Sequence, residues 1–156
     1  MNVPTFTLDE ALELVVAKFF HEMPFNRLLG LEVLSFDKTQ TKLIFNNKPE
    51  LIGNYEQQIL HGGVIAAVLD VASGLICISD MLNRMTSFSK ERLRKRLATI
   101  GTIDLNINYL RPGHGKKFIA SAEVIRTGNK ISVARAELYN EENKHIATGI
   151  ATYLVG

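Results

Sequence analysis

The chain has 156 residues, is 46% hydrophobic and 22% charged, and carries a formal net charge of +2 at pH 7. This length is typical of one domain that buries enough surface to fold without cross-links, and the composition excludes a disordered chain. The nearly balanced charge argues against a general nucleic-acid-binding protein. Cys77 is the single cysteine, which excludes an intrachain disulfide. The sequence contains no CxxC pair and no dense His/Cys cluster, so no metal site is expected.

The N-terminal third predicts one helix and one hairpin. Residues MNVPTFTLDEALELV lack the basic segment and apolar core of a secretion signal, so a cytoplasmic location is expected. Thr7 and Glu10 form a capping-box pattern, and the apolar positions after them keep a helical spacing, which predicts a helix from about 7 to 21. LEVLSF and TKLIFNN flank the polar FDKTQT and predict two strands of a hairpin.

The run LHGGVIAAVLDVASGLICIS, residues 60–79, predicts a long apolar helix over about 62–79. It is short for a membrane span and carries Asp70 near its middle, so no membrane span is expected. In the following segment 80–98, DMLNRMTSFSKERLRKRLA, five basic residues between 90 and 96 stand against Glu91. A charged run of this kind is most often the solvated face of a helix.

From residue 100 the pattern predicts only strands. TIGTIDLNINYLRP alternates apolar and polar positions, and KHIATGIATYLV forms the last strand. Between them, KKFIASAEVIR and KISVARAELYN are joined through Thr127-Gly128-Asn129, a strong signal for a tight hairpin. The simplest arrangement is one α+β domain over residues 1–156, in which an antiparallel sheet wraps on one side around the apolar helix.

Asp70 and the His61-Gly62-Gly63 sequence are the candidates for chemistry. An unpartnered carboxylate among apolar residues costs several kcal/mol, so Asp70 either reaches a water-filled pocket or has a chemical role. The helix start offers free backbone N–H groups and positive potential, which suits a developing oxyanion; the alternative is that the sequence only makes a tight turn onto the helix. Gly62 and Asp70 are eight residues, about 12 Å, apart on one helix. If they act on one carbonyl, they come from different subunits.

These motifs resemble the hotdog-fold acyl-CoA thioesterases, in particular the phenylacetate-pathway (PaaI-like) group. The resemblance rests on LHGGVIAAVLD, GTIDLNINYLRP, and VIRTGNKISVARAEL followed by IATGIATYLV, and it covers most of residues 28–156. It implies a hotdog fold with an extra N-terminal helix. It also implies hydrolysis of an acyl-CoA thioester to free acid and coenzyme A without a cofactor. The expected assembly is a homodimer, or a dimer of dimers.

The resemblance also implies roles for single residues. Asp70 becomes the catalytic carboxylate, acting as general base or nucleophile, and the Gly62 N–H becomes the donor to the thioester oxygen. His61 shapes the loop, and Thr102 positions the attacking water. Asn54 is the nearest match to an amide that contacts the carbonyl, with Gln57 or Gln58 as substitutes.

Coenzyme A carries phosphates, and its expected contacts are Gly63, Gln58, Arg111, Arg126 and Lys130. The segment 80–98 is longer than the family's usual connection from the central helix to the third strand. The alternative to a solvated helix face is that this segment is a lid or attracts these phosphates. Two other functions stay open: a non-catalytic acyl-CoA-binding module, and a hotdog enoyl-CoA hydratase. The presence of Asp70 counts against the first. The second needs a histidine paired with an aspartate in a different motif.

Overall fold

The computed structural model describes residues 6–156. The first five residues, part of the segment that lacks the pattern of a secretion signal, lie outside this range. The chain begins with α1 (Leu8–Leu14), which continues as a π-helix, η1 (Val15–His21), and a short α2 (Pro24–Leu29). The Thr7 hydroxyl accepts a hydrogen bond from the Glu10 N–H, and the Glu10 carboxylate accepts one from the Thr7 N–H. The predicted capping box is therefore present, but the predicted single helix changes type at Val15, and α2 was not predicted.

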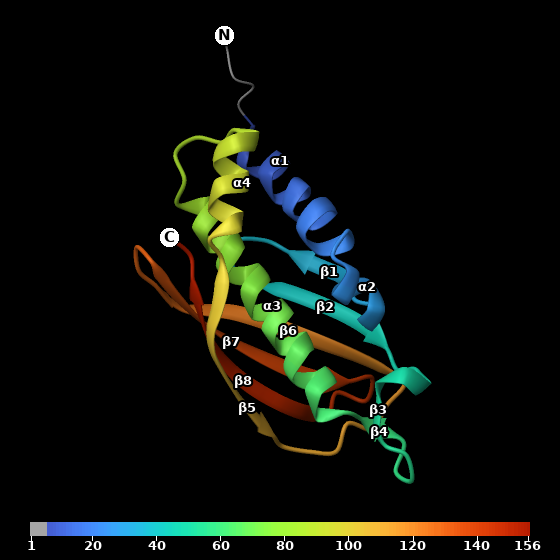
Figure 1. The fold of residues 1–156 in the computed structure, drawn as a ribbon. Helices are drawn as coiled ribbons and strands as arrows, with labels where there is room; N and C mark the ends of the chain where they lie inside the picture. The colour runs from blue at the N-terminus through green and yellow to red at the C-terminus, as the bar shows by residue number, and fades with distance from the viewer. Residues whose placement is uncertain (1–5) are drawn as a thin grey trace.

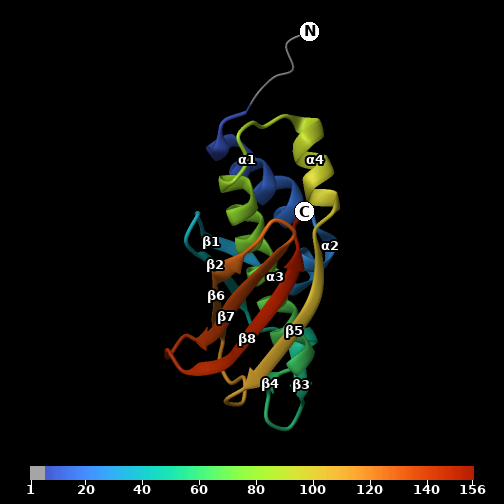
Figure 2. The ribbon, with the colours of Figure 1, turned by 90° about the vertical axis from the view of Figure 1, so that its left-hand side faces the viewer.

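Six strands form one antiparallel sheet. They are β1 (Glu32–Phe36), β2 (Thr41–Asn46), β5 (Gly101–Tyr109), β6 (Lys117–Thr127), β7 (Ile131–Asn140) and β8 (His145–Leu154). Their order is β1-β2-β6-β7-β8-β5, so β1 and β5 are the two edges (Figure 2). A 3-10 turn η2 (Pro49–Leu51) precedes a separate small hairpin of β3 (Ile52–Asn54) and β4 (Ile59–Leu60). The predicted hairpin and the four consecutive later strands are confirmed.

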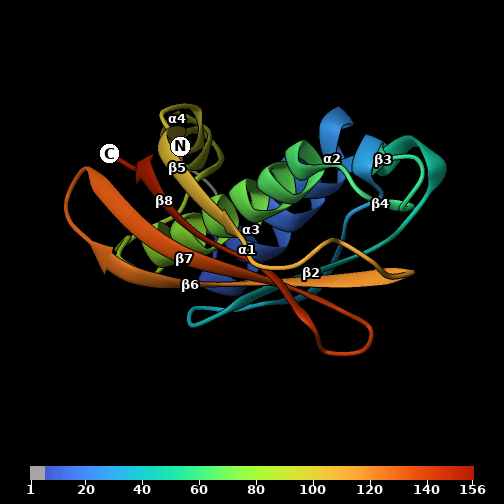
Figure 3. The ribbon, with the colours of Figure 1, turned by 90° about the horizontal axis from the view of Figure 1, so that it is seen from below.

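The central helix α3 (Gly62–Asn83) crosses the concave face of the sheet (Figures 1 and 3). It approaches the strands closely where small residues face it on β6, β7 and β8. These positions are at most 2% exposed, and they are Ala120, Ala122, Ala134, Ala136, Ala147 and Ala151. Larger side chains of the helix, such as Leu69 and Ile76, fill the space above them. Each such buried side chain contributes about 1.5–3 kcal/mol.

Among residues 6–156, α3 alone is long and apolar enough to cross a membrane by length and composition. Its apolar window is 56% buried inside the protein, which is the burial of a core helix. The helix ends at Asn83 rather than near residue 79, so the first turn of the predicted 80–98 insertion belongs to it.

The rest of that insertion contains a second helix, α4 (Lys90–Ala98), which Ser89 caps by accepting a hydrogen bond from the Arg92 N–H. Leu93 and Leu97 are buried, whereas four of the five basic residues between 90 and 96 are exposed. The basic run is therefore one face of an amphipathic helix, which Figure 1 shows after the end of α3.

Candidate active site

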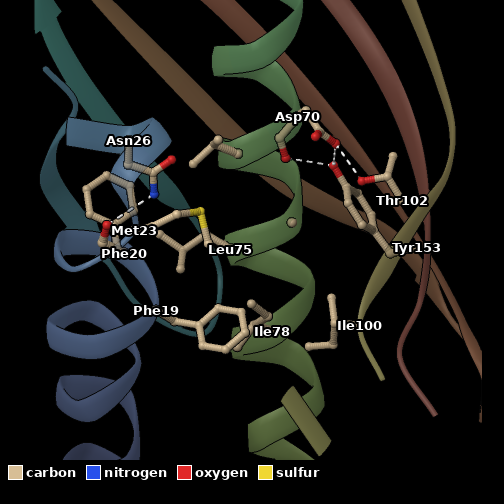
Figure 4. Close-up of a pocket in the computed structure, with 12 residues that line it drawn as sticks. Phe19, Phe20, Met23, Asn26, Asp70, Leu75, Ile78, Ile100, Thr102 and Tyr153 are labelled. Atoms are coloured by element: carbon tan, nitrogen blue, oxygen red, sulfur yellow. Dashed lines mark hydrogen bonds between the residues drawn. The ribbon is translucent and has the colours of Figure 1, made fainter. Parts of the chain in front are cut away.

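The Asp70 carboxylate lies on α3, between the helix and two strands of the sheet. Its Oδ1 accepts a hydrogen bond from Thr102 Oγ1 at 3.0 Å and one from the Tyr153 hydroxyl at 2.7 Å (Figure 4). Thr102 and Tyr153 are cross-strand partners on β5 and β8, so the register of the sheet places both donors together. Within the described part of the chain, Oδ2 accepts no hydrogen bond. One oxygen of Asp70 is thus held, and the other is free.

Tyr153 is only 2% exposed and is a donor to Asp70. Burial raises the pKa of the Tyr153 hydroxyl, and the negative charge of Asp70 and the hydrogen bond to it raise this pKa further. The phenol therefore stays a proton donor to Asp70 at neutral pH. Its oxygen also lies 2.7 Å from the Asp70 carbonyl oxygen, which offers its proton a second acceptor.

The carboxylate lies at the edge of an apolar pocket of about 160 Å³. The walls come from η1, α2, α3 and the start of β5, and they consist of Phe19, Phe20, Met23, Asn26, Val71, Gly74, Leu75, Ile78 and Ile100 (Figure 4). Together with Thr102 and Tyr153, Asp70 makes one polar end of an otherwise mostly apolar hollow. The half-buried carboxylate therefore has both polar partners and access to a pocket that suits an apolar ligand.

The start of α3 is fixed by His61. The His61 Nδ1 accepts a hydrogen bond from the Gly63 backbone N–H at 2.8 Å, and the His61 backbone N–H donates to the Leu51 carbonyl at 2.8 Å. Because Nδ1 is the acceptor, a neutral His61 carries its proton on Nε2. Gly53 passes so close that a Cβ there would lie 2.4 Å from the His61 Cα. His61 thus holds the loop before the helix against β3.

Of the two glycine N–H groups at this helix start, only one is available to a ligand. The Gly63 N–H is used by His61, whereas the Gly62 N–H donates to no acceptor in residues 6–156. Tyr109 packs beside it, and its hydroxyl donates to the Gly62 carbonyl at 2.8 Å. The geometry therefore leaves Gly62 as the free donor and gives Gly63 a structural contact.

The residues expected to contact substrate do not all converge in one protomer. Asn54 Oδ1 accepts from the Gln57 N–H at 3.1 Å and Gln58 Nε2 donates to the Tyr55 carbonyl at 2.6 Å, so both close the turn between β3 and β4. Among residues 6–156, neither side chain hydrogen-bonds to Gly62 or Asp70.

The basic residues expected to bind coenzyme A also divide into two groups. Arg111 lies after β5 and donates to the His145 carbonyl, whereas Arg126 and Lys130 flank the β6–β7 turn. Tyr109 pairs with Ala147, and Leu154 pairs with both Gly101 and Ile131, so the two ends are seven residues, about 23 Å, apart along β8. Within one protomer, Arg111 therefore does not reach the same phosphate group as Arg126 and Lys130, and the contacts of all three with coenzyme A stay predictions.

Sequence reasoning missed both tyrosines, Tyr109 and Tyr153. Each occupies an inward-facing position of an alternating strand, and a polar aromatic residue there is the available signal. Which helix residue each tyrosine reaches depends on how α3 crosses β5 and β8, and the local pattern does not contain that information.

An antiparallel sheet wrapped around a long helix, with a carboxylate beside an apolar pocket and a free N–H at the helix start, is the arrangement of the hotdog fold. A model of the thioesterase superfamily matches residues 57–147. The chain belongs to the thioesterase superfamily, and the predicted hotdog fold and thioesterase class are confirmed.

Individual relatives agree with this assignment. The medium/long-chain acyl-CoA thioesterase YigI of Salmonella typhimurium is 51% identical over 150 residues, which cover 96% of this chain and 97% of YigI. A crystal structure from Shewanella oneidensis, described as related to the thioesterase superfamily, is 47% identical with a TM-score of 0.91 and covers 96% and 97% of the two chains. PaaI of Escherichia coli, from the phenylacetic acid degradation operon, is 18% identical with a TM-score of 0.76 over 96% of each chain, and it shares the fold.

Proposed function

We propose that the protein hydrolyses medium- and long-chain acyl-CoA thioesters to the free acid and coenzyme A. The observation that carries this proposal is the Asp70 carboxylate, held by Thr102 and Tyr153 at the polar end of an apolar pocket. The 51% identity to YigI across nearly the whole chain supports the choice of substrate. The reaction uses water and needs no cofactor.

In this proposal the thioester oxygen accepts a hydrogen bond from the Gly62 N–H, which stabilises the negative charge that develops on that oxygen. Oδ2 of Asp70, the oxygen without a donor, either takes the proton of the attacking water or attacks the carbonyl carbon itself. Both routes break the C–S bond, and the departing sulfur takes up a proton of the water that is consumed, so coenzyme A leaves as the thiol. Thr102 and Tyr153 orient the carboxylate, which is a more direct role for Thr102 than the expected positioning of water.

The two routes differ in where the water oxygen goes. If Asp70 is the general base, the oxygen of water enters only the product acid. If Asp70 is the nucleophile, an acyl–aspartyl anhydride forms and its hydrolysis at the Asp70 carbonyl introduces that oxygen into the side chain. Turnover in ¹⁸O-labelled water, followed by mass spectrometry of the peptide that contains Asp70, distinguishes them.

The proposed site is shared between two subunits, because Gly62 and Asp70 are about 12 Å apart on one helix. Each has its own partner on β5: Tyr109 lies beside Gly62, and Thr102 beside Asp70. The midpoint of Thr102 and Tyr109 on β5 falls between Leu105 and Asn106, and β5 is an edge strand. A two-fold axis there would pair two β5 strands antiparallel and bring Gly62 of each protomer toward the partner's Asp70. We therefore propose a homodimer in which the β5 strands of the two protomers pair with each other.

A free-thiol assay across short, medium, long and aromatic acyl-CoAs tests the proposed activity. We expect the highest kcat/KM with medium and long chains. Binding of acyl-CoA without thiol release would support the non-catalytic binding module instead. Loss of enoyl-CoA absorbance without thiol release would indicate a hydratase.

A further inference from the structure

We propose that the N-terminal segment, residues 7–29, sets the acyl-chain length that the pocket accepts, and that Phe19 closes the pocket at the end away from Asp70. This inference rests on the proposed function, because it assigns the pocket to the acyl chain. It concerns residues outside the range 57–147 that the thioesterase superfamily model matches.

The pocket runs lengthwise along α3. The helix contributes Asp70, Val71, Gly74, Leu75 and Ile78, whose spacing places them on one face. Asp70 and Ile78 are eight residues, about 12 Å, apart along the axis. In Figure 4 the carboxylate lies at one end with Thr102 and Tyr153, and Ile78 lies at the other with Phe19 and Ile100. A thioester carbonyl beside Asp70 would therefore direct its acyl chain toward Phe19.

The wall opposite α3 and β5 comes from the N-terminal segment, through Phe19, Phe20, Met23 and Asn26. Phe20 is 1% exposed and belongs to the core, whereas Phe19 is half-buried at the pocket. Both lie in the π-helix η1, a helix type that occurs often at functional sites. Asn26 Nδ2 donates to the Phe20 carbonyl at 3.2 Å and fastens α2 to the end of η1. The wall is thus fixed, and Phe19 is its most exposed aromatic ring.

The proposed selection of chain length and the catalytic carboxylate lie in different parts of the chain. Asp70, Thr102 and Gly62 lie within residues 57–147, whereas Phe19 lies outside, as does Tyr153, which holds Asp70. Each additional methylene buried in an apolar pocket raises kcat/KM by about fourfold. Removing the Phe19 ring makes room for further methylenes, so we expect the ratio of kcat/KM for hexadecanoyl-CoA over octanoyl-CoA to rise about tenfold. A larger ring should lower that ratio.

The experiment measures thiol release from hexanoyl-, octanoyl-, dodecanoyl- and hexadecanoyl-CoA for the wild type, Phe19→Ala and Phe19→Trp. The matched control is Val16→Ala, which also shortens an apolar side chain of η1 but faces a separate hollow beside Phe36. We expect the ratio to rise with Phe19→Ala, to fall with Phe19→Trp and to stay unchanged with Val16→Ala. If Phe19→Ala does not fold, Phe19→Leu replaces it and should shift the ratio in the same direction.

The results separate this inference from the proposed function. An active Phe19→Ala enzyme whose kcat/KM changes by one common factor for all four esters would overturn the role of Phe19, and so would an equal shift in Val16→Ala. A wild type that releases no thiol would overturn the proposed function instead. In that case, Kd values of non-hydrolysable thioether analogues of the same chain lengths test Phe19 directly, and a ratio unaffected by Phe19→Ala contradicts its role.

Discussion

Replacing Asp70 by asparagine removes the proposed base or nucleophile while keeping the shape of the side chain. The amide oxygen can still accept from Thr102 and Tyr153, which bond to the same carboxylate oxygen at 3.0 and 2.7 Å. The amide nitrogen then takes the place of Oδ2 and can neither accept a proton nor attack. Because general acid–base catalysis contributes about 10²–10⁴-fold, we expect kcat to fall by at least that range.

Stability should change far less than activity. Two hydrogen bonds to a charged acceptor become neutral ones in Asp70→Asn, which costs at most about 2 kcal/mol, or several degrees in Tm. Asp70→Ala loses both bonds and should be the less stable variant. A thiol-release assay with dodecanoyl-CoA and a thermal melt of each variant measure the two effects. A folded Asp70→Asn protein with more than about a tenth of the wild-type kcat would refute the assignment.

Three further predictions concern the surroundings of this carboxylate and the basic helix. Tyr153→Phe should lower kcat about tenfold with little change in KM, and Thr102→Val should likewise lower kcat by less than Asp70→Asn does. If either folded variant loses more activity than Asp70→Asn, that residue and not Asp70 carries the main catalytic role. Burial raises the pKa of the Cys77 thiol to about 11. The free energy of unfolding should therefore fall from about pH 9 to 11, because the thiol ionises at lower pH in the unfolded chain than in the folded protein. Denaturant titrations over this range should show a smaller fall for Cys77→Ala. If α4 attracts coenzyme A, replacing Arg94, Lys95 and Arg96 by glutamine should raise KM and weaken its dependence on salt, which kinetics at low and high salt measure. Unchanged kinetics at low salt would indicate that α4 is only a solvated face.

The fold follows from the sequence where local patterns are strong. The alternation in GTIDLNINY and the Gly128-Asn129 turn predicted β5 and the β6–β7 hairpin. The capping box at Thr7 predicted the start of α1. The change to a π-helix at Val15 and the restart at Pro24 were not predicted, because apolar spacing alone does not distinguish an α-helix from a π-helix.

The candidate site shows the same division. Asp70 stands out in the sequence as a lone acid in an apolar run, and His61-Gly62-Gly63 stands out as a helix start. The pairing of Thr102 with Asp70 was not derivable from the residues, because it depends on where β5 lies against α3. The use of the Gly63 N–H by His61 likewise depends on a side-chain rotation that no pattern encodes.

The central claim, a site shared between subunits, is tested by combining two inactive variants. Asp70→Ala removes the carboxylate, and Gly62→Pro removes the backbone donor. Proline is tolerated at the first position of a helix, and His61 already has the extended backbone, φ −62° and ψ 135°, that suits a residue before proline. Each variant alone should be nearly inactive.

The two variants are unfolded together in equal amounts and refolded, and native mass spectrometry establishes that mixed dimers form. About half of the dimers should be mixed, and each mixed dimer has one site with both groups intact and one site with neither. Shared sites predict recovery of about a quarter of the wild-type activity. Well-folded mixed dimers without recovered activity would contradict the account, because each site would then be built within a single chain.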